Sequence, residues 1–124
     1  MTEKRESTFL QNHDRVDVIF TIVSRGKGED IMDMMREDGV HINVLCHGRG
    51  TAPSKILEMF GLGATEKDVV LSFVKNERSA EVLEKISKEM EFAKPGKGIA
   101  FTVPMQSIVG EKNLRLLIAS FEED

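Results

Sequence analysis

Two glycine-rich segments of the chain carry cationic side chains and are suited to bind an anion. Residues 48–51 read Gly-Arg-Gly-Thr and offer open backbone amides, one guanidinium and one hydroxyl. Residues 94–98 read Lys-Pro-Gly-Lys-Gly and offer a similar backbone with two ammonium groups. Backbone amides beside glycines converge on a phosphate or carboxylate without obstruction by side chains. Neither segment has the Walker or dinucleotide-binding spacing. A solvated turn therefore explains each segment alone. Only the presence of two such segments in one small domain favours a ligand site.

Metal binding and catalysis find less support in the sequence. Cys46 and His47 are neighbours and His41 lies on the same expected strand, and these residue types bind metals. Adjacent strand residues point to opposite faces, however, so Cys46 and His47 do not easily share an ion. Cys46 continues an apolar series, which predicts a buried thiol. No paired carboxylates and no nucleophile motif stand out, so we expect a binding protein that is not an enzyme and holds no metal.

The composition limits the class of protein. The chain has 124 residues, 40% of them apolar, which fits one domain with a modest core. Its net charge of −4 comes from interspersed acids and bases, which argues against a nucleic-acid surface. One cysteine allows no internal disulfide. No apolar run reaches the length of a membrane span, and the polar first residues do not resemble a signal peptide. We therefore expect a cytoplasmic protein without membrane insertion.

The periodicity of apolar residues predicts a ferredoxin-like fold. Alternating residues indicate strands, and spacings of three and four residues indicate helices. The expected order is strand, helix, strand, strand, helix, strand, at residues 16–23, 29–38, 40–46, 69–74, 79–90 and 99–103. Gly39 suits the end of the first helix and Ser79 the N-cap of the second. This β-α-β-β-α-β order predicts an α+β sandwich, a four-stranded antiparallel sheet with both helices on one face.

The ends of the chain are expected to lie outside this domain. We assign residues 1–15 to an N-terminal extension with a possible edge strand around Phe9. Residues 16–110 form the ferredoxin-like domain, with a short turn at residues 106–110. The apolar run at residues 114–121 predicts an added strand, so that residues 111–124 form a C-terminal strand and an acidic tail.

The sheet face away from the helices is expected to be apolar as well. We assign Ile19, Val23, Leu45, Val70 and Val74 to that open face. A sheet with two apolar faces needs a second cover. Since only the tail and other subunits are available to provide it, we predict an oligomer in which the open faces are buried together.

The connection between the second and third strands is unusually long. It spans residues 47–67, whereas neighbouring antiparallel strands are normally joined by a few residues. Within it, residues 54–60 have helical spacing, with Ile56, Met59 and Phe60 on one side. Such a stripe either packs on a neighbouring subunit or binds a partner protein.

Together these segments resemble the P-II nitrogen-regulatory signalling family and its P-II-like relatives. The resemblance rests on residues 48–51, on Glu66-Lys67-Asp68 and on residues 95–104, and it covers about residues 16–110 in the same element order. It implies a ferredoxin-like homotrimer whose long connection, the T-loop, inserts into target proteins. It also implies that the loop before the last strand, the B-loop, helps to bind ATP or ADP between subunits. Many members also sense 2-oxoglutarate, and their targets are transporters and enzymes of nitrogen metabolism.

Several positions match the family motifs. Gly48 and Arg49 match the Gly-Arg pair at the base of the T-loop. Lys67 stands where the family has a lysine before the third strand, and Gly96 and Gly98 match the two B-loop glycines.

Other positions depart from the family pattern. Gly50 replaces the glutamine that serves magnesium and 2-oxoglutarate, and Ile99 replaces a B-loop lysine. The basic pair beyond the fourth strand falls near Ile108 and Gly110, and the chain has no tyrosine to be uridylylated. Three anion-binding side chains of the family are therefore missing.

The sequence thus predicts a trimeric P-II-like regulatory protein that binds a small anionic effector, ATP or ADP, and acts on a transporter or metabolic enzyme. The predicted ligand-binding residues lie in the two loops and at the return of the connection: Gly48, Arg49, Gly50, Thr51, Lys67, Lys94, Gly96, Lys97 and Gly98. The predicted partner-binding residues are Ile56, Met59 and Phe60. Two alternatives stay open, a structural trimer without nucleotide binding and a metal-responsive P-II-like protein that uses His41 or His47.

Overall fold

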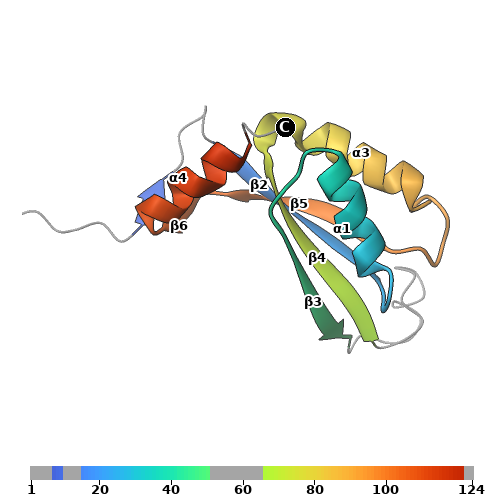
Figure 1. Ribbon diagram of the computed structural model, residues 1–124. Helices are drawn as coiled ribbons and strands as arrows, with labels where there is room; N and C mark the ends of the chain where they lie inside the picture. The colour runs from blue at the N-terminus through green and yellow to red at the C-terminus, as the bar shows by residue number, and fades with distance from the viewer. Residues whose placement is uncertain (1–6, 10–14, 51–65, 122–124) are drawn as a thin grey trace, which may run out of the picture.

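A four-stranded antiparallel sheet with two helices on one face forms the body of the protein (Figure 1). The structure is a computed structural model that describes residues 7–9, 15–50 and 66–121. The sheet has the strand order β3-β4-β2-β5. Its strands are β2 (Val16–Ser24), β3 (Asn43–Arg49), β4 (Glu66–Lys75) and β5 (Ile99–Met105). The predicted ferredoxin-like fold is confirmed.

Two helices cross over between the strands. Helix α1 (Gly28–Glu37) joins β2 to β3, and α3 (Ser79–Glu89) joins β4 to β5 after the short 3-10 helix η2 (Asn76–Arg78). Gly39 follows α1 with a φ of +82°, as the prediction of a helix-ending glycine requires. Acidic residues in the first turn of each helix and a basic residue in the last turn complement the helix dipole.

The helices cover the opposite face of the sheet from the one that we predicted. The residues assigned to the open face, Ile19, Val23, Leu45, Val70 and Val74, all belong to the core beneath α1 and α3. The open face instead carries Val18, Phe20 and Ile22 of β2, with Phe20 stacked on Phe101 at 5.3 Å between ring centroids. Both faces are apolar, so the alternation of residues alone does not decide which one the helices cover.

The paired strands extend beyond their apolar stretches. The prediction ended the second strand at Cys46 and began the third at Val69, whereas β3 runs to Arg49 and β4 begins at Glu66. Gly48 pairs with Lys67 and Arg49 with Glu66, because backbone pairing continues through polar residues. Cys46 is exposed in this chain, contrary to the expected buried thiol, because it lies on the uncovered face of the edge strand β3.

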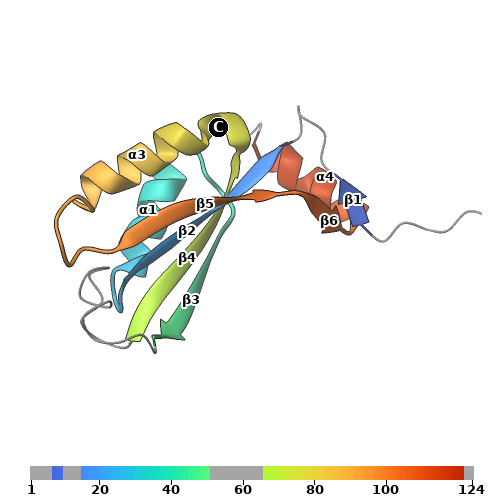
Figure 2. The same cartoon turned by 180° about the vertical axis from the view of Figure 1, so that it is seen from behind.

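A small unit projects from the end of the sheet, as Figures 1 and 2 show. Strand β1 (Ser7–Phe9) pairs with β6 (Ser107–Val109), where we predicted a turn, and α4 (Glu111–Ser120) contacts β6. The prediction of a strand over residues 114–121 is wrong, since a short continuous apolar run does not distinguish a strand from a helix. None of the helices in the described ranges is long and apolar enough to cross a membrane.

The two β-α-β halves of the sheet repeat the same pattern of buried residues. Asp17, Ile19, Thr21 and Val23 of β2 have counterparts in Asp68, Val70, Ser72 and Val74 of β4, at equal spacing. In each half the aspartate lies near the start of its strand, close to the beginning of the helix that follows the other strand. The repeat thus gives each helix a buried carboxylate at its N-terminal end.

Candidate functional site

Three loops meet one end of the sheet. Ser24 at the end of β2 pairs with Lys67 at the start of β4, and β5 begins beside Ile22. The turn between β2 and α1, the base of the connection from β3 to β4, and the loop at residues 94–98 therefore share this end. The two predicted anion-binding segments therefore follow or precede strands at the same end of the sheet.

Within one chain, however, these two segments lie at opposite edges of the sheet. Gly48 and Arg49 belong to the edge strand β3, and residues 94–98 lead into the other edge strand, β5. Since β4 and β2 separate those edges, three strand spacings of roughly 4.8 Å each lie between the two segments. Only a second copy of the chain could bring one segment against the other.

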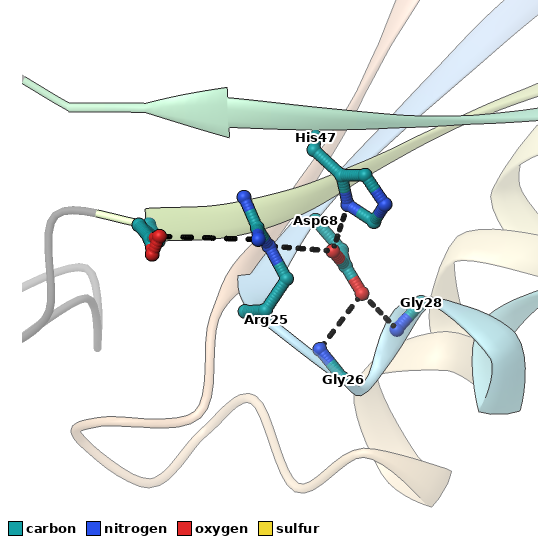
Figure 3. A network of polar contacts seen from close by, with 6 residues as sticks. Arg25, Gly26, Gly28, His47 and Asp68 are labelled. Carbon is teal, nitrogen blue, oxygen red and sulfur yellow. Dashed lines mark hydrogen bonds and ion pairs between the residues drawn. The ribbon is translucent and has the colours of Figure 1, made fainter.

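The polar centre of this end is the carboxylate of Asp68. Its side chain lies on β4 facing the helices, and the residue is 2% exposed. Its Oδ2 accepts hydrogen bonds from the backbone amides of Gly26 at 2.9 Å and Gly28 at 3.0 Å. Its Oδ1 contacts Nδ1 of His47 on β3 at 2.8 Å (Figure 3). One side chain thus connects β4, β3 and the turn that enters α1.

Asp68 takes the place of an N-cap side chain for α1. The N-cap residue of this helix is Lys27, whose side chain makes no capping bond. The carboxylate reaches the free amides of the first turn from the neighbouring strand, where the helix dipole also favours negative charge. Gly28 permits this approach, because a Cβ there would lie 2.5 Å from Leu45 Cδ1 and 2.9 Å from Asp68 Oδ2.

The environment of Asp68 keeps its carboxylate ionised. Burial raises the pKa of the Asp68 carboxyl, but hydrogen bonds from Gly28, Gly26 and His47, together with the charge of His47, outweigh burial and lower this pKa below its ordinary value. Because the carboxylate is ionised, His47 must donate Nδ1–H to it. In the neutral imidazole Nε2 is then the acceptor, and in the imidazolium it is a second donor, on a side chain that is 60% exposed.

Arg25 is the second cation beside Asp68, and it is held more loosely. Its Nε lies 3.6 Å from Asp68 Oδ1, and its Nη1 lies 3.9 Å from Glu66 Oε1. Both separations exceed a normal charged hydrogen bond. The Arg25 side chain is 46% exposed, so its guanidinium remains accessible to a ligand at this end of the sheet.

The predicted loop at residues 94–98 is built on its glycines. Gly98 has a φ of +128°, and a Cβ there would lie 2.7 Å from the carbonyl oxygen of Ile22. Gly96 has a φ of +92° with open space around it. Lys94 is paired with Glu91 at 2.5 Å, whereas Lys97 is exposed. The loop therefore presents exposed backbone and two exposed lysine side chains, of which Lys94 is paired with Glu91.

The remaining predicted site residues are placed unevenly. Arg49 is exposed and Gly50 half-buried at the base of the connection, but Lys67 is only 8% exposed and is the least accessible of the predicted cations. Four predicted site residues lie outside the described residues: Thr51, Ile56, Met59 and Phe60. Among the described residues no group of three His, Cys, Asp or Glu side chains is arranged to hold a metal ion.

The sequence analysis missed the roles of Asp68 and Arg25 and considered His47 only as a metal ligand. One signal was present, because aspartate is disfavoured in strands and Asp68 begins an otherwise apolar stretch of β4. The partner of that carboxylate could not be read from the sequence, since Gly26 and Gly28 are about forty residues away along the chain.

Comparison with known proteins places the fold but not the activity. No protein-family model and no curated protein sequence matches the chain. Among solved structures, CutA from Synechococcus elongatus PCC7942 matches with a TM-score of 0.67 and 10% identity, over 93% of this chain and 95% of that one. The apo form of CPII from Thiomonas intermedia K12, a nitrogen regulatory PII-like protein, matches with a TM-score of 0.58 and 16% identity, over 81% and 95%.

Two further structures belong to the same two groups. A putative PII-like signalling protein from Thermus thermophilus matches with a TM-score of 0.57 and 14% identity, over 79% of this chain and 94% of that one. The periplasmic divalent cation tolerance protein CutA from Archaeoglobus fulgidus matches with a TM-score of 0.62 and 12% identity, over 86% and 98%. At these identities the likeness concerns the fold alone. In its fold, the chain resembles CutA and the PII-like proteins.

Proposed function

We propose that this protein is a PII-like signalling protein that binds a small anionic effector, ATP or ADP, and regulates a partner protein. The observation that carries the proposal is the position of the two glycine-rich segments. They lie at one end of the sheet but at its two opposite edges. Adjacent copies of the chain would therefore bring the Gly48–Arg49 edge of one against residues 94–98 of the next, with the ligand between them.

The open sheet face supports a homotrimer as the working assembly. Phe101 is 40% exposed on this face, and Val44 and Val103 are exposed there as well. Exposed apolar side chains that extend across a sheet mark an interface between proteins. A ring of copies would cover this face and would also close the edge strands β3 and β5.

Regulation of the partner is assigned to the connection between β3 and β4. The predicted contacts are Ile56, Met59 and Phe60, and they remain a prediction because they lie outside the described residues. A target in nitrogen metabolism and a cytoplasmic location belong to the same proposal. The target derives from the resemblance to the P-II family and from the likeness to the PII-like structures, whereas the location is the expectation drawn from the sequence.

Titration calorimetry with ATP, ADP and AMP tests effector binding. We expect the full-length protein to bind at least one of these nucleotides. The Arg49→Ala variant should bind roughly ten- to 150-fold more weakly, since a charged hydrogen bond contributes about 1.5–3 kcal/mol. Arg36→Ala is the matched control, because Arg36 lies on α1 and pairs with Asp33. If none of the three nucleotides gives a binding heat or a thermal shift, nucleotide binding is refuted and the structural trimer remains as the alternative.

A response to divalent cations is the second candidate. It is favoured by the likeness to the divalent cation tolerance protein CutA from Archaeoglobus fulgidus, which matches over 86% of this chain against 81% for the PII-like CPII. His47 is the imidazole suited to it, because a carboxylate on Nδ1 orients Nε2 toward an ion. Elemental analysis after zinc or copper loading tests this role. The role is supported if the wild type binds about one ion per subunit and His47→Ala binds none. It is refuted if the loaded wild type contains no metal.

A further inference from the structure

Arg25 stands on an anchored turn, but its side chain is loosely held. The backbone amide of the next residue, Gly26, donates to Asp68 Oδ2 at 2.9 Å and fixes the turn. The guanidinium of Arg25 makes only long ion pairs, at 3.6 Å to Asp68 and 3.9 Å to Glu66 (Figure 3). No hydrogen bond joins this guanidinium to a residue that the structure describes. These contacts therefore leave its N–H donors for a ligand.

Neither carboxylate beside Arg25 depends strongly on the guanidinium. Asp68 already accepts two backbone amides and contacts His47 at 2.8 Å. Glu66 lies two residues earlier on β4, so its side chain projects from the same face of the strand as Asp68. The Glu66 side chain is 48% exposed, and exposed ion pairs are weak. Arg25 can therefore leave Glu66 at little cost.

A second arginine stands on the other side of Glu66. Arg49 is directly opposite Glu66 in the pairing of β3 with β4, so the two side chains project from one face of the sheet. Arg25 approaches Glu66 from the side of β2, because β2 is the other neighbour of β4. One exposed carboxylate thus lies between two exposed arginines, at the end of the sheet where the three loops lie.

We propose that Arg25 and Arg49 together bind the anionic part of the effector, and that Glu66 occupies this position until the ligand displaces it. The inference rests on the proposed function, since the ligand is the effector proposed above. It adds Arg25 as a binding residue and Glu66 as a residue that sets the affinity. Because the ion pair of the free protein must be given up on binding, Glu66 weakens the binding of every anion at this position.

The spacing of the two arginines favours a ligand with linked phosphate groups. Arg25 directly follows β2 and Arg49 ends β3, with β4 between those strands, so their backbones lie two strand spacings, or roughly 10 Å, apart. A diphosphate presents charged oxygens to both guanidinium groups at once. A single phosphate must draw both side chains inward, at a cost in side-chain entropy. Pyrophosphate and ADP should therefore depend on Arg25 more than inorganic phosphate does.

Two substitutions with opposite expected effects test the proposal. ADP, pyrophosphate and inorganic phosphate are titrated into the full-length protein by calorimetry at low ionic strength, where exposed charges are least screened. Glu66→Gln should bind ADP and pyrophosphate roughly two- to fivefold more tightly, because it removes an exposed ion pair from the free protein. Arg25→Ala should bind them roughly tenfold more weakly, because the charged hydrogen bonds lost outweigh the weak ion pairs that Arg25 gives up on binding.

The exposed pair of Asp33 and Arg36 on α1 provides matched controls. Asp33→Asn and Arg36→Ala change the net charge by the same amounts as Glu66→Gln and Arg25→Ala, and they should leave the affinities unchanged. Circular dichroism shows whether each variant remains folded. Effects of equal size in the controls would reduce the result to overall charge and overturn the proposal.

The outcomes separate this proposal from the proposed function. If ADP binds and neither Glu66→Gln nor Arg25→Ala changes its affinity, the roles of Arg25 and Glu66 are overturned and the effector stands. If pyrophosphate responds to both variants as expected but no nucleotide binds, the anion site stands and the nucleotide effector is overturned. If neither the wild type nor Glu66→Gln binds ADP or pyrophosphate, both fail. An equal loss of affinity for phosphate and pyrophosphate in Arg25→Ala would overturn the preference for linked phosphates.

Discussion

At the scale of single residues, two buried carboxylates organise the helix-covered side of the sheet. Asp68 serves the entrance to α1, and Asp17 serves the entrance to α3, where its Oδ2 accepts hydrogen bonds from Asn76 Nδ2 at 3.0 Å and from Ser79 Oγ. Ser79 therefore does not act as the predicted N-cap. Arg78 occupies that position, and the hydroxyl of Ser79 points to Asp17 instead. In both halves a strand aspartate lies at a helix entrance, but Asp68 accepts backbone amides at the start of α1 whereas Asp17 accepts side-chain donors of η2 and α3.

Asp68→Asn tests the structural part of this arrangement. The amide cannot accept all three hydrogen bonds with a full charge, so we expect a loss of about 1–3 kcal/mol in the free energy of unfolding. Chemical denaturation followed by circular dichroism measures it. Asp33→Asn is the control, because Asp33 is an exposed partner of Arg36, and its effect should stay within about 0.5 kcal/mol. Equal stability of Asp68→Asn and wild type would show that the carboxylate is not needed at the helix entrance.

The lowered pKa of Asp68 predicts how that contribution depends on pH. Burial raises the pKa of this carboxyl, but its hydrogen bonds and His47 bring it below the ordinary value of 3.8. A group with a depressed folded-state pKa stabilises the protein above its unfolded-state pKa, and this stability is lost as the pH falls through the folded-state value. The stability difference between wild type and Asp68→Asn should thus be constant between about pH 5 and 6 and shrink below about pH 4. Unfolding measured across this range checks the sign, and a difference that grows on acidification would contradict it.

At the scale of elements, the loop at residues 94–98 is fastened to the sheet by Gly98. The close approach to Ile22 leaves no room for a side chain, and Phe92 closes the other side at 3.1 Å from the position of a Cβ. Gly96 shares the positive φ but faces open space. Gly98 is therefore required by both packing and backbone conformation, whereas Gly96 is required by backbone conformation alone.

Alanine at each of the two positions separates these constraints. Gly98→Ala should cost roughly 3 kcal/mol or more, because the methyl group meets backbone and strains φ at once. Gly96→Ala should cost roughly 1 kcal/mol through φ alone. Thermal and chemical unfolding of the two variants measures the difference. Similar costs for both would contradict the close contact between Gly98 and β2.

At the scale of the whole molecule, the sheet has one face closed by helices and one face open. The open face carries the stacked pair Phe20 and Phe101 and reaches the edge strands on both sides. Such a surface is typical of a chain that assembles with copies of itself. The unit of β1, β6 and α4 lies beyond the end of the sheet and leaves this face uncovered in Figure 2.

A charge on the open face should prevent assembly. Phe101→Lys and Val44→Lys place an ammonium group at exposed positions of β5 and β3. We expect the wild type to sediment as a trimer at about 10 µM and both variants to sediment as monomers. Leu116→Lys is the control, because Leu116 is exposed on α4 away from the sheet. Circular dichroism shows whether each variant remains folded. A monomeric wild type, or trimers of both sheet variants, would refute the role of the open face.

Local patterns determined the element order and with it the fold. Residues such as Ile31, Met34 and Met35 in α1 mark a helix by their spacing, and the β-branched run of β2 marks a strand, because each pattern reflects one face of one element. The same reasoning located the glycines of the loop at residues 94–98 and the cations Arg49 and Lys97. These features depend on neighbours along the chain, which the sequence displays directly.

Tertiary structure decided what depends on distant partners. The choice of sheet face was wrong because β2 is apolar on both sides, and only the crossing of α1 and α3 closes one of them. The apolar run at residues 114–121 lies largely in the helix α4, which contacts β6, and the run alone did not distinguish a helix from a strand. The contacts of Asp68 could not be recognised from the sequence, because its partners come from three separate segments. Only the folded sheet brings Gly26, Gly28 and His47 to one carboxylate. A sequence records which groups are available, whereas burial and hydrogen bonding are properties of the pairs that folding creates.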